Sequence, residues 1–192
     1  MYLVVGSVHY IMEKSLKIEH LDVYSLKEMD SYLTRETCDF FSQAAVVCLD
    51  NQNHSPGVTF KVEGDLSAEF QLFWKPVTEQ MKNSCYDMQY TTEAGAYCLA
   101  ILMTQKLTEY KVIRQSQKGT GFDFWLGDKK DDYPFENKAR LEISWILKGT
   151  QNQINQRINQ KIAQTKQSNG LKLPAYIAVA EFGTPQLQMK KR

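Results

Sequence analysis

The spacing of apolar residues in the first half of the chain predicts helix followed by a β-hairpin. Between Ser25 and Leu49 apolar side chains recur at helical spacing, which predicts one long helix or two consecutive helices. A turn-rich stretch over 50–57 ends this region. Residues 58–62 and 68–74 then alternate between apolar and polar, with Gly and Asp at 64–65 between them, as expected for an antiparallel hairpin. Residues 1–11 read as a short strand.

The second half predicts the order helix, three strands, helix, strand. The first helix is expected from Thr92 to Tyr110, with Thr91 or Thr92 as its cap and Glu93 in its first turn. Strands are expected at 111–116, 122–126 and 139–146, and a second helix at about 151–167, ended by Asn169-Gly170. Residues 175–182 are apolar on both faces, which indicates a central strand. The pattern predicts an α/β (α+β) fold with a mixed sheet between helices.

Length and composition restrict the class of protein. A chain of 192 residues with 43% apolar and 23% charged residues is expected to form one soluble globular domain. The four cysteines form no C-x-x-C pair and share no ligand spacing with the three histidines, so we expect reduced thiols, no zinc site and a cytoplasmic location. No apolar run approaches the roughly 18 residues of a membrane span.

The formal net charge of +1 conceals an asymmetry along the chain. Residues 1–137 hold 13 Lys and Arg against 20 Asp and Glu, whereas residues 138–192 hold ten against two. A basic carboxy-terminal segment could bind the phosphates of DNA or an acidic protein partner. Alternatively, the two parts of the chain could simply attract each other. The sequence leaves both interpretations open.

Two acidic residues within apolar strands carry the candidate chemistry. Asp123 and Glu142 each interrupt an apolar run, where an ionised side chain is costly unless something pairs with it. If their strands form a hairpin, both carboxylates can lie on one face of the sheet, where Mg²⁺ or Mn²⁺ could bridge them. Without metal, repulsion should raise one of the two pKa values. The alternative is a structural ion pair of each acid with Arg140 or Lys118.

In element order and in these two acids, residues 87–185 resemble the restriction-endonuclease-like superfamily, the PD-(D/E)XK nucleases. Those enzymes carry an aspartate on the second core strand and Glu-x-Lys on the third, positions that Asp123 and Glu142 match. Some members add an acid from the first helix, and Glu93 matches by position, although a first-turn glutamate also suits the helix dipole. The resemblance implies a metal-dependent nuclease core, with 1–86 as an extension of helix plus hairpin and 186–192 as a basic tail. The segment 118–123 is also similar to that of uncharacterised bacterial proteins.

The chain departs from that motif at Ser144, which stands where the resemblance expects lysine. The lysine would help orient the attacking water and stabilise charge on the phosphate, whereas serine brings no charge. Three cations could replace it: Lys161 on the following helix, Lys118 in the Gly-rich turn before Asp123, and Arg140 on the strand of Glu142. We prefer Lys161, because an Ile154–Ile158–Ile162 stripe should hold that helix against the sheet.

Two functions of different classes follow. The first is a divalent-metal-dependent nuclease or DNA-processing protein with an incomplete motif. The second is a catalytically inactive binding or assembly protein that keeps the fold, with the acids serving its structure or a partner surface. The residues show no Ser-His-Asp, Cys-His or nucleotide-binding signature that would favour a third class.

Overall fold

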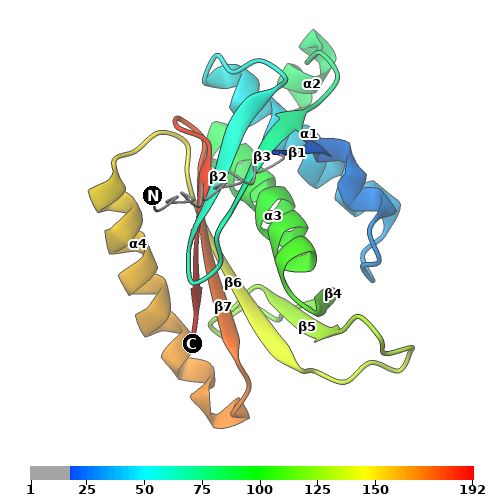
Figure 1. The fold of residues 1–192 in the computed structure, drawn as a ribbon, viewed down its shortest axis with the longest axis vertical. Coiled ribbons are helices and arrows are strands. Elements are labelled where there is room, and N and C mark those ends of the chain that lie inside the picture. Colours follow the sequence, from blue (N-terminus) through cyan, green and yellow to red (C-terminus); the bar gives the residue numbers. More distant parts are fainter. Residues whose placement is uncertain (1–17) are drawn as a thin grey trace, which may run out of the picture.

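Eight strands form one mixed sheet that runs through the whole molecule (Figure 1). The computed structural model describes residues 18–192, and the strand expected within residues 1–11 lies outside them. The elements, in chain order, are β1 (Glu19–Asp22), a 3-10 helix η1 (Val23–Glu28), α1 (Arg35–Asn51), β2 (Val58–Gly64), β3 (Ala68–Phe73), α2 (Glu79–Ser84), α3 (Met88–Leu107), β4 (Tyr110–Gln115), β5 (Phe124–Asp128), β6 (Ala139–Ile146), α4 (Gln151–Gln164), a 3-10 helix η2 (Thr165–Leu171), β7 (Ala175–Glu181) and β8 (Gln186–Lys191).

The strand order in the sheet is β1-β3-β2-β8-β7-β6-β5-β4. Strand β7 lies inside the sheet, parallel to β6 and antiparallel to β8, and all of its residues are buried. The prediction of a central, two-sided strand at 175–182 is therefore confirmed. The predicted hairpin of β2 and β3 is also present, as is the pairing of β5 with β6.

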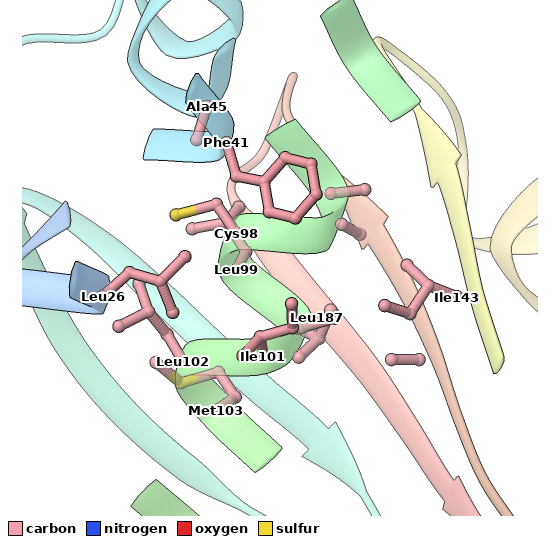
Figure 2. Close-up of a cluster of buried hydrophobic side chains, with 14 of the residues drawn as sticks. Leu26, Phe41, Ala45, Cys98, Leu99, Ile101, Leu102, Met103, Ile143 and Leu187 are labelled. Atoms are coloured by element: carbon pink, nitrogen blue, oxygen red, sulfur yellow. The ribbon is translucent and has the colours of Figure 1, made fainter. Parts of the chain in front are cut away.

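Helices cover both faces of the sheet (Figure 1). Helices α1 and α3 pack on one face, where the larger core gathers side chains such as Leu99, Ile101 and Ile143 (Figure 2). Helix α4 covers the other face through Ile154 and Ile158, which contact the β7 side chains Ile177 and Val179. The predicted isoleucine stripe thus packs against the sheet, with Ile162 partly buried beside it. Burial of a large aliphatic side chain contributes about 1.5–3 kcal/mol.

Helix α3 begins earlier than the sequence predicts. The side chain of Asp87 caps it by accepting the amides of Gln89 and Tyr90, whereas the hydroxyls of Thr91 and Thr92 bond to carbonyl groups of preceding residues. An aspartate at the N-cap satisfies amides that would otherwise lack partners. Glu93 therefore lies beyond the first turn, and the helix-dipole explanation for it is wrong.

Helix α4 begins as predicted but ends differently. Thr150 and Gln153 form a reciprocal capping box at its start. The predicted end at Asn169-Gly170 is wrong, because the chain continues as η2 through both residues and the left-handed residue is Lys172, with φ 54°. This continuation places the backbone of η2 beside β6, where it binds Arg140.

The predicted basic tail at 186–192 is wrong, because residues 186–191 form strand β8 between β7 and β2. Its alternation buries Leu187 and Met189, and Lys190 pairs with Asp65 of the hairpin turn. Through β8 the amino-terminal hairpin joins the same sheet as the carboxy-terminal half. Within residues 18–192 no helix combines the length and the apolarity needed to cross a lipid bilayer.

Candidate functional site

Asp123 and Glu142 meet at one cavity. Asp123 lies immediately before β5, and Glu142 lies in the middle of β6. The register pairs Phe124 with Leu141, which places the two acids opposite each other across the strands. Both line a cavity of about 640 Å³, whose wall also includes Glu93, Tyr97, Gln115, Ser116, Gln117, Lys118, Gly119, Gly121, Phe122, Gln164 and Gln167.

Backbone hydrogen bonds with neighbouring segments hold Asp123 in the sheet. Its amide donates to the Leu141 carbonyl at 2.9 Å, and its carbonyl accepts the Ser116 amide at 2.7 Å. Its carboxylate Oδ2 accepts the amide of Ile143 at 2.7 Å. The Asp123 side chain, at the start of β5, thus accepts a backbone amide of β6. Two hydrogen bonds fix the main chain of Asp123, and one fixes its carboxylate.

Glu142 is a buried acid with one oxygen unpartnered. Its side chain is 1% exposed, and its Oε1 accepts from the Lys161 ammonium at 2.5 Å. Its Oε2 is buried and has no hydrogen-bond partner among the described residues. Burial, and next the charge of Asp123, raise the pKa of Glu142 to about 7, although Lys161 opposes the shift. The predicted repulsion between the two acids is therefore present.

Asp123 is perturbed in the same direction. Burial is the largest cause that raises its pKa, and the charge of Glu93 adds to it. The Ile143 amide, the Lys161 charge and the Tyr97 hydroxyl act in the opposite direction. Burial and the repulsion between like charges thus raise the pKa values of both neighbouring carboxyl groups. A bound cation would lower both pKa values again.

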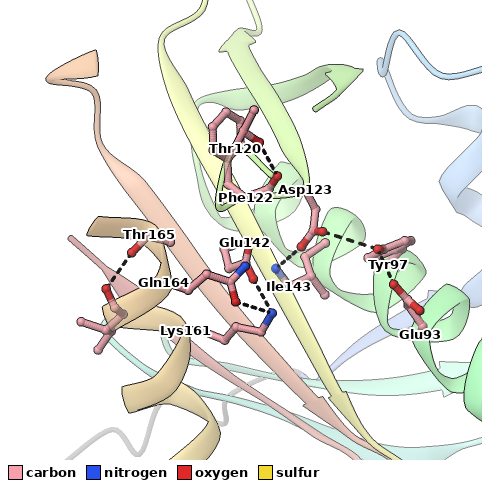
Figure 3. A network of polar contacts seen from close by, with 11 residues as sticks. Glu93, Tyr97, Thr120, Phe122, Asp123, Glu142, Ile143, Lys161, Gln164 and Thr165 are labelled. Carbon is pink, nitrogen blue, oxygen red and sulfur yellow. Dashed lines mark hydrogen bonds and ion pairs between the residues drawn. The ribbon is translucent and has the colours of Figure 1, made fainter. Parts of the chain in front are cut away.

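Lys161 of α4 points toward Glu142, as Figure 3 shows. Its ammonium also donates to Oε1 of Gln164, one turn further on, at 3.2 Å. Because α4 is fixed to the sheet through Ile154 and Ile158, the lysine is presented to Glu142 from the neighbouring helix. Of the three cations proposed as replacements, Lys161 is the one that the structure places on a site carboxylate.

The other two cations do not pair with the acids. The guanidinium of Arg140 donates to the carbonyl oxygens of Ser168 and Leu173, at 2.8 and 2.6 Å, and to the Ser168 hydroxyl. Arg140 therefore fastens η2 to β6. Lys118 is exposed on the cavity wall and takes part in no ion pair of the described region. The ion pairs expected with Arg140 or Lys118 are absent among the described residues, and Lys161 takes that place on Glu142.

Ser144 follows Glu142 by two residues on β6 and is 3% exposed. It pairs with Val179 in the register of β6 and β7 and is not part of the cavity wall. Its hydroxyl is thus away from the cavity that Asp123 and Glu142 share. A role for Ser144 on a water in this cavity has no support in the geometry.

Tyr97 connects Glu93 to the site (Figure 3). Its hydroxyl donates to Oε1 of Glu93 at 2.9 Å and lies 3.5 Å from Oδ1 of Asp123. Burial, followed by the charges of Asp123 and Glu93, raises the pKa of Tyr97. Tyr97 is a site residue that was not predicted from the sequence. The Glu93–Tyr97 spacing of four residues was the available signal, because such pairs face each other on a helix.

The glycine-rich turn before Asp123 packs against the end of α4. Gly121 has φ 84°, and a Cβ on it would lie 2.9 Å from the carbonyl oxygen of Gln164. Both the positive φ and this close approach require glycine. The turn is thereby held beside the helix residue that also accepts from Lys161, so it forms one rim of the cavity.

The donor set can be compared with the needs of a divalent cation. In the part of the chain that the structure describes, no three His, Cys, Asp or Glu side chains are grouped closely enough to hold a metal. Mg²⁺, however, often binds through one or two carboxylates and keeps several waters. Oε2 of Glu142 has no partner, and Oδ1 of Asp123 has only the 3.5 Å contact with Tyr97. Neither of these two oxygens has a hydrogen bond shorter than 3.5 Å among the described residues.

Comparisons of the chain with protein-family models, with curated proteins and with solved structures found no match.

Proposed function

We propose that this protein is a divalent-metal-dependent phosphodiesterase that acts on nucleic acid, with a divergent site of the PD-(D/E)XK type. The observation that carries the proposal is that Asp123 and Glu142 line one cavity and that Lys161 of α4, rather than Ser144, supplies a cation to Glu142. The unpartnered Oε2 of Glu142 supports it, because a buried carboxylate oxygen without a partner is costly.

Asp123 and Glu142 would hold Mg²⁺ or Mn²⁺, which would polarise a phosphoryl oxygen and lower the pKa of a bound water. The Ile143 amide keeps the Asp123 carboxylate in place. Tyr97 orients Glu93 beside it. These contacts define the position of the acids before any substrate arrives.

Lys161 would supply the positive charge that the motif lysine provides elsewhere in that superfamily. Its ammonium has three donors, and only two are used, on Glu142 and Gln164. The remaining donor would bind a phosphate oxygen beside Glu142, where negative charge increases during phosphodiester cleavage. Lys118 on the opposite rim would attract the phosphate backbone without pairing to an acid.

The test is cleavage of single- and double-stranded DNA and RNA with Mg²⁺ or Mn²⁺. We expect slow turnover by the parent protein, and loss of turnover in Asp123→Asn and Glu142→Gln. Asp132→Asn, at an exposed position outside the cavity, is the matched control and should retain turnover. If the parent shows no cleavage with any divalent ion, the phosphodiesterase proposal is refuted.

A second candidate is the inactive binding or assembly protein. It is favoured by the Lys161–Glu142 ion pair, which already neutralises the acid, and by the lack of a third metal ligand in the described residues. In that case replacing both members, as in Lys161→Met with Glu142→Leu, should preserve or increase stability, because buried ion pairs are often replaceable by apolar residues. Added Mg²⁺ or Mn²⁺ should then leave the melting temperature of the parent unchanged.

A further inference from the structure

Three aromatic side chains form an exposed cluster beyond the edge strand β4. We call Tyr32, Tyr133 and Phe135 the aromatic platform. Tyr32 is 58% exposed and Tyr133 is 73% exposed, which is unusual for such large rings. Together with Thr34, Arg114 and other residues they line a hollow of about 540 Å³. The platform combines residues from the segment before α1 and from the loop between β5 and β6.

The platform rings are arranged against one another. Tyr32 and Tyr133 are stacked, with centroids 5.8 Å apart and an interplanar angle of 16°. Phe135 meets Tyr32 edge-on at 4.9 Å and Tyr133 at 6.0 Å. The exposed tyrosines therefore present flat faces whose orientation is set by their neighbours, at a low cost in conformational entropy on binding.

Strand β4 holds the platform in position. The amide of Tyr32 donates to the Val112 carbonyl at 2.8 Å, which fixes its backbone to the edge of the sheet. The ammonium of Lys111 lies 5.0 Å from the Phe135 ring centre and pairs with Asp30 at 3.0 Å. The rings are thus anchored to the strand that leads to the acidic cavity.

The platform hollow and the acidic cavity are adjacent. Gln115, the last residue of β4, lines both. Arg114 stands on the platform side, 5.4 Å from the Trp125 ring centre, and Lys118 stands on the cavity side. In the described residues neither cation has a carboxylate partner. A chain of phosphates that follows Gln115 would meet one unpaired cation on each side.

We propose that the aromatic platform binds unpaired bases of a nucleic acid strand whose phosphate backbone enters the acidic cavity. The inference rests on the proposed function and assigns its substrate class, a single strand or a single-stranded end. Aromatic side chains bind unpaired bases by stacking on their free faces, largely regardless of sequence. In a duplex those faces are covered by neighbouring base pairs. Exposed tyrosines beside a phosphate path therefore select unpaired strands.

A proline-rich peptide is the other occupant that an aromatic-lined hollow can accept. We favour nucleic acid because the hollow shares the wall residue Gln115 with the acidic cavity, and one cation lines each of them, Arg114 the hollow and Lys118 the cavity. A peptide ligand would not need a second, adjacent cavity. Capture of a proline-rich peptide at Tyr32 and Tyr133, without binding of any oligonucleotide, would overturn the proposal.

The experiment measures oligonucleotide binding by the full chain in EDTA, where cleavage cannot occur. Fluorescently labelled oligodeoxythymidylate, oligouridylate of the same length and a blunt DNA duplex are titrated by anisotropy. We expect at least one single strand to bind more tightly than the duplex. Tyr133→Ala and Tyr32→Ala should each weaken that binding about tenfold. Tyr133→Phe keeps the ring and should retain most of the affinity.

Tyr86→Ala is the matched control. Tyr86 is 86% exposed and lies by the last turn of α1, near Asp50 and Asn51, whereas the platform lies before its first turn. Its removal should leave the dissociation constant unchanged. Equal binding by the parent and the two platform alanine variants, or a preference for the duplex, would overturn the platform proposal.

The two proposals fail separately. If the parent binds single strands through the platform but cleaves nothing, the phosphodiesterase is refuted and the platform stands. If the parent cleaves, and Tyr133→Ala changes neither the dissociation constant nor the cleavage of single strands, the platform is refuted and the phosphodiesterase stands.

Discussion

The ammonium of Lys161 lies 2.5 Å from Oε1 of Glu142, and it joins helix α4 to strand β6. The lysine side chain is 20% exposed, whereas the glutamate side chain is 1% exposed. The partly exposed ammonium therefore covers the buried carboxylate. The ion pair gives Lys161 a structural role besides any role in chemistry.

Lys161→Ala should therefore destabilise the protein. Its removal leaves the buried Glu142 carboxylate without the one side-chain donor that it has among residues 18–192, which costs about 1–3 kcal/mol. Urea unfolding at pH 8 in EDTA measures the loss. Lys166→Ala, at an exposed position without an ion pair in the described region, should change stability by less than about 0.5 kcal/mol. Equal midpoints for the two variants would contradict the prediction.

Glu142 should make stability depend on pH. Its pKa is raised from 4.5 to about 7, so the folded state binds a proton that the unfolded state has already released. This contribution is fully present below about pH 4.5 and is lost as the pH rises through about 7. Glu142→Gln should remove the dependence and exceed the parent in stability at pH 8 by about 1–3 kcal/mol. Parallel stability curves for both proteins between pH 4.5 and 8 would contradict it.

The central strand and the position of α4 were predictable, because periodicity records burial on one or two faces. The two acids were predictable for the same reason, since charged residues inside apolar strands are conspicuous. The ends of the helices were not. The Asp87 cap competed with Thr91 and Thr92, and all three are residues that favour helix starts.

The role of β8 was missed because its sequence is short and basic. Leu187 and Met189 alternate with polar residues, but two apolar positions are too few to identify a strand by pattern. The strand forms because β7 and β2 both pair with it through backbone hydrogen bonds. The pairing of Lys190 with Asp65 also supports the intramolecular interpretation of the charge asymmetry at that position.

Mg²⁺ or Mn²⁺ should raise the melting temperature of the parent. Ligand at a hundredfold excess over its dissociation constant stabilises a folded protein by about 2.7 kcal/mol. The rise should be larger at pH 8 than at pH 6, because the ion competes with the proton on Glu142. Asp123→Asn should abolish the rise, since it removes the charge while an amide oxygen can still accept from Ile143. Asp132→Asn should retain it. A parent that shows no shift would exclude the metal site.

Tyr97→Phe should separate the role of the Tyr97 hydroxyl in positioning Glu93 from the role of its ring in packing. The ring contacts of Tyr97 with Phe41 and Phe124, at 5.4 and 5.3 Å, are kept in the variant, whereas the hydroxyl bond to Glu93 is lost. We expect a loss of about 0.5–1.5 kcal/mol in EDTA and a smaller metal-induced rise in melting temperature. Tyr90→Phe, at an exposed tyrosine of the same helix, should alter neither quantity. An unchanged metal response in Tyr97→Phe would show that the Glu93–Tyr97 pair does not act on the site.

The close crossing of α1 and α3 gives a test of the scaffold that is independent of the site. A Cβ on Gly95 would lie 2.9 Å from Cα and 3.0 Å from N of Ala45, both backbone atoms. Gly95→Ala should therefore destabilise the protein by about 1–3 kcal/mol, although alanine is intrinsically favoured within a helix. Gly170→Ala is the control, because a Cβ there meets nothing within 4 Å. Adding Ala45→Gly should not rescue Gly95→Ala, since the overlap is with the backbone of residue 45. Rescue would show that the helices are separated by side chains and can move apart.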